Sequence, residues 1–234
     1  MYCSTDMAIA NWYDHLRTSV IPSRPYDKKM YTITGRVVEE PGDWMLREID
    51  IAAEMGSEAF MIDAGWYGER FEHWHHNRGD WYTGKFLADG YMAAICEYVH
   101  SKGMLFGLWM EPETMGKNSK VLEEHPNWIL NSDGKNAGYP GYDGQLIDLS
   151  NREAALYIEK SILNVINEYK LDFLKLDYNL RLPEGGQNLR DGFAEGEEWR
   201  HFEVIYGIFD RVLKEYPAIA LENCAGGEEE MTWV

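Results

Sequence analysis

The chain of 234 residues has few basic side chains and no long apolar run. Lysine and arginine number 22 against 40 aspartates and glutamates, which gives a formal net charge of −18. A surface of this sign repels the phosphates of nucleic acids and the headgroups of anionic membranes, so we expect neither as a partner. No apolar stretch reaches the roughly 18 residues that suggest a membrane-spanning helix.

Cysteine is also scarce. Cys3, Cys96 and Cys224 are odd in number and far apart in sequence. They therefore offer no disulfide framework and no paired spacing for zinc, which fits a reducing compartment. The first twenty residues have neither a basic start nor a continuous apolar stretch, so no signal peptide is expected. We predict a cytoplasmic protein.

Signals for a metal or a cofactor are weak. The run at His73, His75 and His76 is predicted to lie in a loop, where adjacent side chains rarely converge on one ion, and no HxxxH helix is present. The glycine-rich segment 138–144 lacks the strand–GxxxxGK–helix context of a phosphate loop. We therefore expect no metal and no cofactor.

What the chain does contain is an alternation of short apolar runs with amphipathic segments. The runs predict strands at 30–34, 59–63, 104–109, 172–177 and 218–222. The amphipathic segments predict helices at 43–55, 90–102, 151–169 and 197–215, with Asn/Asp-type capping at the start of the third and Pro217 after the last. Buried strands that alternate with helices are typical of a parallel α/β fold.

The spacing of the strands favours a barrel. Their centres recur about every 47 residues, and a (β/α)8 TIM-type barrel at that pitch needs roughly another 140 residues. The sequence thus predicts an incomplete barrel with about five of the eight strand–helix units. We expect residues 1–29 to be a lead-in segment and residues 30–234 to form the partial barrel. Its open edge is expected to favour self-association.

Four carboxylates stand at or just after the ends of predicted strands: Asp63, Glu111, Asp177 and Glu222. In a parallel barrel the carboxyl ends of the strands face one mouth, so these groups are expected to converge there. Trp66, Trp109 and Lys175 lie close to them in sequence. Aromatic rings stack on sugar rings and carboxylates accept hydrogen bonds from hydroxyls, so the pattern favours a sugar site.

Six motifs in sequence order carry a resemblance to a known family. They are MIDAGWYG (61–68), GDW (79–81), FGLWMEPE (106–113), HPNW (125–128), LDFLKLDYN (171–179) and ENCAGG (222–227). Together they resemble the α-galactosidases of glycoside hydrolase family 36, which shares a clan with family 27, over about residues 30–227. The resemblance implies a (β/α)8 catalytic barrel that hydrolyses terminal α-galactosides with retention of configuration and without a metal.

The resemblance also implies roles for individual residues. Asp177 matches the nucleophile, and Lys175 matches a lysine that contacts sugar hydroxyls. An ammonium beside Asp177 is expected to keep that carboxylate ionised and ready to attack. The remaining substrate-binding residues that the resemblance implies are Asp63 for the distal hydroxyls, Trp66 and Trp109 as ring-facing aromatics, and Cys224, Gly226 and Gly227 in the turn near the 2-hydroxyl.

The sequence departs from the family pattern at three places. Ala64 stands where many relatives have a second aspartate, so one polar contact to the distal hydroxyls is missing. Asp143-Gly144-Gln145 lacks the arginine that relatives often have there. The acid/base aspartate of the family lies eight residues after the cysteine, and counting from Cys224 leads to Thr232. We expect Glu228, Glu229 and Glu230 to be solvated, so no acid/base residue is identified.

Two other functions remain open from the sequence. The chain is also compatible with a catalytically inactive sugar-binding or structural barrel fragment, because the acid/base residue is not identified. A metal-dependent barrel lyase or isomerase, with the four strand-end carboxylates around Mg²⁺, is the third candidate. The ordered motifs and the tryptophans favour the glycosidase.

Overall fold

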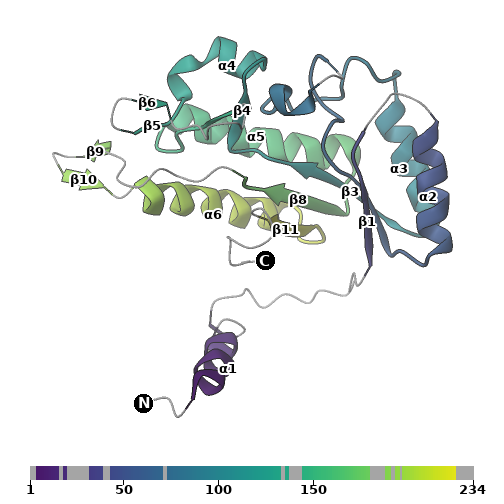
Figure 1. Cartoon of the computed structure of the whole chain (residues 1–234), viewed down its shortest axis with the longest axis horizontal. Coiled ribbons are helices and arrows are strands. Elements are labelled where there is room, and N and C mark those ends of the chain that lie inside the picture. The colour runs from purple at the N-terminus through teal and green to yellow at the C-terminus, as the bar shows by residue number, and fades with distance from the viewer. Residues whose placement is uncertain are drawn as a thin grey trace.

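Five parallel strands form the centre of the protein (Figure 1). The computed structural model describes residues 4–15, 18–19, 32–38, 43–70, 73–132, 135–136, 144–179, 188–190, 193–195 and 197–224. The strands are β1 (Ile33–Arg36), β2 (Ala59–Ile62), β3 (Leu105–Met110), β8 (Phe173–Asp177) and β11 (Ala220–Cys224). They lie side by side in chain order, and all four pairings are parallel.

One long helix lies in each connection between consecutive strands. These helices are α2 (Trp44–Glu54), α3 (Tyr91–Ser101), α5 (Arg152–Tyr169) and α6 (Glu197–Glu215). Each helix contacts the next along the chain, so the helices form a layer over the sheet. Sequential parallel strands with a helix in every connection are the repeating unit of a (β/α)8 barrel. The prediction of a partial TIM-type barrel is confirmed.

The helix boundaries follow the local signals in the sequence closely. The side chain of Asn151 accepts hydrogen bonds from the backbone N–H groups of Glu153 and Ala154, and this cap starts α5. Helix α6 ends two residues before Pro217, as expected. The last strand differs, because β11 begins two residues later than predicted, after a turn in which Ile219 donates to the carbonyl of Tyr216. Cys224 consequently ends a strand.

Shorter elements fill the connections. The β2–α3 connection holds the 3₁₀ helix η2 (Trp74–Asn77). The β3–α5 connection holds β4 (Thr114–Gly116), α4 (Lys120–Glu124), η3 (Pro126–Trp128), β5 (Asn131–Ser132), β6 (Lys135–Asn136) and β7 (Gly144–Leu146). The β8–α6 connection holds the antiparallel pair β9 (Asn188–Arg190) and β10 (Phe193–Glu195).

Helix α1 (Thr5–His15) has no buried residue and lies apart from the sheet in Figure 1. Met7, Ile9, Trp12 and Tyr13 on this helix are exposed. Within the described part of the chain, no helix combines the length and apolarity that a membrane crossing requires.

The two faces of the sheet have different partners. Ile62, Leu108 and Leu174 are fully buried and belong to the same hydrophobic cluster as the buried side chains of the helices. Alternate residues point to the opposite, inner face. There Phe173 fills the space beside Gly107, since a Cβ on Gly107 would lie 2.3 Å from the Phe173 ring. The missing side chain of Gly107 on β3 therefore leaves the space that the Phe173 ring occupies on the inner face.

This packing predicts opposite effects for two glycine-to-alanine substitutions. Gly107→Ala is expected to lower the free energy of unfolding by about 1–3 kcal/mol, because the new methyl group collides with Phe173. Gly207→Ala, inside α6, meets nothing closer than 3.4 Å and should raise it by about 0.5–1 kcal/mol through helix propensity. Urea unfolding of both variants measures this. Equal effects of the two substitutions would contradict the packing described for β3 and β8.

Candidate active site

Strand register brings the polar side chains of the inner face together. Trp109 on β3 is paired with Lys175 on β8, and Lys175 is paired with Glu222 on β11. Asp63 directly follows the last residue of β2. Two residues further along β8, Asp177 is paired with Cys224. Because alternate residues of a strand share a face, these side chains form two successive rows toward the carboxyl ends of the strands.

Asp177 is buried and is held by three N–H groups. Its Oδ2 accepts hydrogen bonds from Trp109 Nε1 at 3.0 Å and from Asn179 Nδ2 at 2.8 Å. Its Oδ1 accepts one from the backbone N–H of Tyr178 at 3.1 Å. Three hydrogen bonds to one carboxylate fix its orientation in the site.

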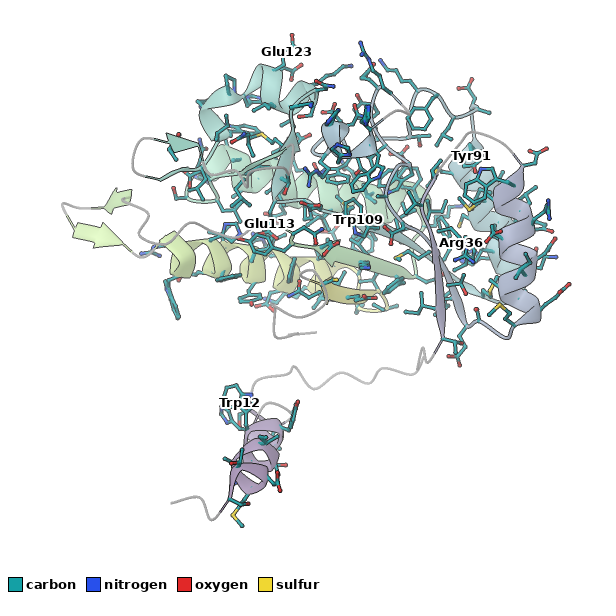
Figure 2. The ribbon with its side chains drawn as sticks, viewed as in Figure 1. Trp12, Arg36, Tyr91, Trp109, Glu113 and Glu123 are labelled. Atoms are coloured by element: carbon teal, nitrogen blue, oxygen red, sulfur yellow. The ribbon has the colours of Figure 1, made fainter. Side chains whose placement is uncertain are left out.

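The indole of Trp109 lies in the interior of the molecule (Figure 2), within a cluster of aromatic rings. Its ring lies nearly parallel to that of Tyr67, with centroids 6.2 Å apart and planes 15° apart. The ring of Trp74 lies nearly perpendicular to it, with centroids 5.6 Å apart. Trp66 is fully buried in the same cluster, and its Nε1 donates to the backbone carbonyl of Trp109 at 2.9 Å. The structure thus places Trp66 behind Trp109, where it supports that residue. The predicted sugar-facing position of Trp66 does not agree with this burial.

Lys175 reaches across β3 toward β2. Its Nζ lies 3.9 Å from Asp63 Oδ2, and both side chains are about one-quarter exposed or less. Asp63 Oδ1 also accepts a hydrogen bond from the backbone N–H of Ala64 at 2.8 Å. The hydrogen bonds that orient Asp177 come from neutral N–H groups. The effect of the Lys175 ammonium on Asp177 stays a prediction. Lys175 can donate hydrogen bonds to the hydroxyl groups of a ligand, and Asp63 can accept hydrogen bonds from them.

Glu222 completes the row on β11. Burial raises the pKa of its carboxyl, and the nearby charges of Asp177 and Asp63 raise it further, while Lys175 opposes both effects. Glu222 is therefore a half-buried acid among two carboxylates and one ammonium.

Glu111 is not accessible at the inner face of the sheet, which differs from the prediction for this carboxylate. Its side chain is fully buried and forms an ion pair with the equally buried Arg78, at 2.8 Å between Oε1 and Nη1. The hydroxyl of Thr114 also donates to Oε1 at 2.8 Å, and Asn179 Nδ2 lies 3.2 Å from Oε2. Glu111 thus differs from the other three strand-end carboxylates, because it is fully buried and holds Arg78 and Asn179 in place.

A second buried pair lies next to the site. Glu113 lies in the connection after β3, and its Oε2 contacts Nε2 of His201 on α6. Both side chains are almost fully buried. The ring of His201 lies 5.7 Å from that of Tyr178, the residue that follows Asp177. The pair therefore ties α6 to the β3 connection beside the end of β8.

Two motifs that support the resemblance have structural roles here. Asp80 of the GDW motif accepts hydrogen bonds from the backbone N–H groups of Lys120 and Val121, at the start of α4. In the HPNW motif, the ring of His125 stacks on that of Trp128 with centroids 3.8 Å apart. Both motifs shape the connections around the site without reaching Asp177.

Other predicted residues are only partly placed. Cys224, the last residue of β11, is half-buried. Gly226, Gly227 and the glutamates Glu228, Glu229 and Glu230 lie outside the described residues. Within the described ranges, no three or more His, Cys, Asp or Glu side chains are grouped so as to hold a metal ion.

Sequence reasoning missed Arg78, Asn179 and Trp74. Asn179 stands two residues after Asp177, and a polar residue two positions from a strand-end carboxylate was a usable signal. Arg78 and Trp74 come from the connection after β2, and no periodic pattern shows which side chains of such a connection turn toward the sheet.

Comparison with known proteins identifies one family. The family model described as Melibiase matches residues 12–231. An α-galactosidase of Escherichia coli is 32% identical over 185 residues, which are 79% of this chain and 25% of that protein. The α-galactosidase Mel36A of Lactobacillus acidophilus is 28% identical over 180 residues, 76% of this chain and 24% of that protein. The chain thus spans about a quarter of the length of these relatives.

Solved structures agree with this fold. A variant of the GH36 α-galactosidase AgaA from Geobacillus stearothermophilus, in complex with stachyose, superposes with a TM-score of 0.79. It is 24% identical, and the match covers 93% of this chain and 31% of that one. Another AgaA variant, in complex with 1-deoxygalactonojirimycin, gives a TM-score of 0.72 at 26% identity, over 87% of this chain and 29% of that one.

Removing the cation of the buried ion pair is expected to be costly. Arg78→Met leaves the buried Glu111 carboxylate without its guanidinium and should lower the free energy of unfolding by about 3–5 kcal/mol. The double variant Arg78→Met/Glu111→Gln should recover much of this loss, because no buried charge remains. A double-mutant cycle from urea unfolding measures the coupling. Additive effects of the two substitutions would contradict a coupled buried pair.

The raised pKa of Glu222 predicts a pH-dependent stability. The folded state binds this proton more tightly than the unfolded state, where the pKa is near 4.5, so ionised Glu222 disfavours folding above its folded-state pKa. Glu222→Gln should therefore be more stable than the parent at pH 8, and the difference should vanish below about pH 4.5. Urea unfolding across this range is the measurement, with Glu97→Gln on the exposed face of α3 as control. A constant difference at all pH values would refute the prediction.

Proposed function

The chain belongs to the melibiase family, and from this membership we propose that it forms the nucleophile-bearing part of a retaining glycoside hydrolase for terminal α-galactosides. Its relatives in the family are named α-galactosidases. Because the chain spans about a quarter of their length, the activity of the whole enzyme belongs to this proposal.

The observation that carries the proposal is the setting of Asp177. This carboxylate ends β8 and is oriented by hydrogen bonds from Trp109, Asn179 and Tyr178. In barrel enzymes the carboxyl ends of the strands carry the catalytic groups. A carboxylate that several N–H groups hold in one orientation is suited to attack a carbon atom at a defined angle.

The chemistry assigned to Asp177 is a displacement at the anomeric carbon. An oxygen of Asp177 forms a C–O bond to that carbon, while the bond to the leaving-group oxygen breaks and its electron pair departs with the leaving group. Water then attacks the same carbon and releases Asp177, so two inversions give net retention. A leaving group that is stable as an anion needs no proton in the first step, so this step tests Asp177 separately from the acid/base residue.

The proposed sugar contacts are Asp63 and Lys175, with Glu222 beside them. Their carboxylates and ammonium face the same side of the sheet as Asp177, and hydroxyl groups both donate and accept hydrogen bonds. Two AgaA structures are complexes with stachyose and raffinose. This supports a galactosyl oligosaccharide as the proposed substrate. Ala64 leaves Asp63 as the single carboxylate at this point of β2.

Four expectations remain predictions. They are the division of the chain after residue 29, a cytoplasmic location, self-association through the edge of the sheet, and contact of Cys224, Gly226 and Gly227 with the 2-hydroxyl.

A covalent trap tests the proposed nucleophile. The chain is incubated with a 2-fluoro-galactosyl donor that has a good leaving group, and the peptides are mapped by mass spectrometry. We expect one added fluorogalactosyl group on Asp177, because the fluorine slows the second step and the leaving group removes the need for an acid. A label on another residue would reject Asp177 as nucleophile, and absence of any label would favour the inactive sugar-binding fragment.

Two variants serve as controls for the trap. Asp177→Asn should abolish labelling, because an amide is a far weaker nucleophile than a carboxylate. Asp210→Asn changes an exposed carboxylate on α6 and should be labelled like the parent. Loss of labelling in both variants would show that the reaction depends on something other than the Asp177 carboxylate.

A further inference from the structure

The two oxygens of the Asp177 carboxylate have unequal surroundings. Oδ2 accepts two side-chain hydrogen bonds, from Trp109 Nε1 and from Asn179 Nδ2. Oδ1 accepts a hydrogen bond from the adjacent backbone N–H of Tyr178. An oxygen that two fixed donors already hold is less free to form a new bond than the other oxygen of the same group.

Asn179 contacts two carboxylates through one nitrogen. Its Nδ2 lies 2.8 Å from Asp177 Oδ2 and 3.2 Å from Glu111 Oε2, so each hydrogen of the NH2 group is directed to a different carboxylate. A primary amide has two such hydrogens, and the opposite amide orientation would direct its carbonyl oxygen at two acceptors. Asparagine is therefore suited to join two carboxylates without adding a charge between them.

The far end of this connection is fixed in the core. Glu111 and Arg78 are both fully buried and form an ion pair at 2.8 Å. Thr114 donates a further hydrogen bond to Glu111, and Arg78 Nε donates to the carbonyl oxygen of His75 at 2.9 Å. A group bonded to Glu111 is thus bonded to a part of the protein with little freedom to move.

We propose that Asn179 is a positioning residue for the proposed nucleophile: it anchors Asp177 Oδ2 to the buried Arg78–Glu111 pair and leaves Oδ1 as the oxygen that attacks. This inference rests on the proposed function for its chemical meaning. The anchoring itself is a property of the folded chain and is testable without any sugar.

The charges around Asp177 predict how loss of the anchor changes its titration. Lys175 lies two residues earlier on β8, and Glu222 and Cys224 lie on β11, where Cys224 is paired with Asp177. Asp63 follows β2, and Glu111, which is paired with Arg78, follows β3. Three of these neighbours are carboxylates. Without the Asn179 N–H groups, ionised Asp177 loses a hydrogen bond and faces Glu111 with no donor between them, and both changes favour its protonated form.

The test compares Asn179→Ala with the parent chain in two measurements. The first is the ¹³C NMR titration of the Asp177 carboxyl carbon in the free protein, assigned with Asp177→Asn. The second is the pH dependence of the labelling rate with the 2-fluoro-galactosyl donor. We expect the titration midpoint and the acid limb of labelling to move to higher pH. Labelling should also be about tenfold slower at the plateau, because a carboxylate that is held less firmly reaches the attacking geometry less often.

Control variants separate anchoring from folding. Asn167→Ala removes an exposed asparagine of α5 and should leave both measurements unchanged. Asn179→Ser keeps one hydroxyl donor and should give a smaller shift than Asn179→Ala. If Asn179→Ala does not fold, a shift in Asn179→Ser supports the anchor, and an unshifted midpoint in that variant overturns it.

The two measurements also distinguish this inference from the proposed function. If the parent chain is not labelled at Asp177, the proposed function fails, while the NMR midpoint still decides whether Asn179 anchors the carboxylate. If labelling slows equally at every pH and the midpoint is the same in the parent and Asn179→Ala, Asn179 has a merely structural role and the inference is overturned.

Discussion

Parallel register across four neighbouring strands is the constraint on which the rest of the site depends. Pairing fixes Trp109 beside Lys175 and Lys175 beside Glu222, and it sets Asp177 one row further along the same face. A slip of one residue in β8 would turn both Lys175 and Asp177 toward the helices. Leu174 and Leu176, which pack on the opposite side, are buried, so such a slip would also expose apolar surface. Hydrophobic burial on one face thus positions charges on the other.

The inner face is supported from behind in two ways. Trp66 and Tyr67 pack around Trp109, whose indole N–H holds one oxygen of Asp177. The Arg78–Glu111 pair reaches the same oxygen through Asn179. An apolar support and an ionic support therefore converge on one carboxylate. Such convergence limits the reorganisation that a reaction at this carboxylate would require.

Local sequence signals predict the long helices and the central strands. They do not predict the start of β11 or the burial of Glu111. Asn151 and Pro217 mark where α5 starts and where α6 has ended, and short apolar runs mark the largely buried central strands. The shift of β11 results from a turn at Tyr216, which apolar patterning does not reveal. Strand-end position predicts Asp63 and Asp177 correctly as inner-face groups. It misplaces Glu111, because an arginine from a distant connection, Arg78, buries that carboxylate.

The central claim is the proposal that the inner face around Asp177 binds a terminal α-galactosyl group. Titration of the ¹⁵N-labelled tryptophan indoles with methyl α-galactoside tests it most directly, because the N–H of Trp109 touches Asp177 and that of Trp12 lies on exposed α1. The account predicts a saturable shift of the Trp109 signal, removed by Asp63→Asn or Lys175→Met, with the Trp12 signal unchanged. A saturable shift at other tryptophans with Trp109 unmoved, or no saturable shift at any indole, would contradict it.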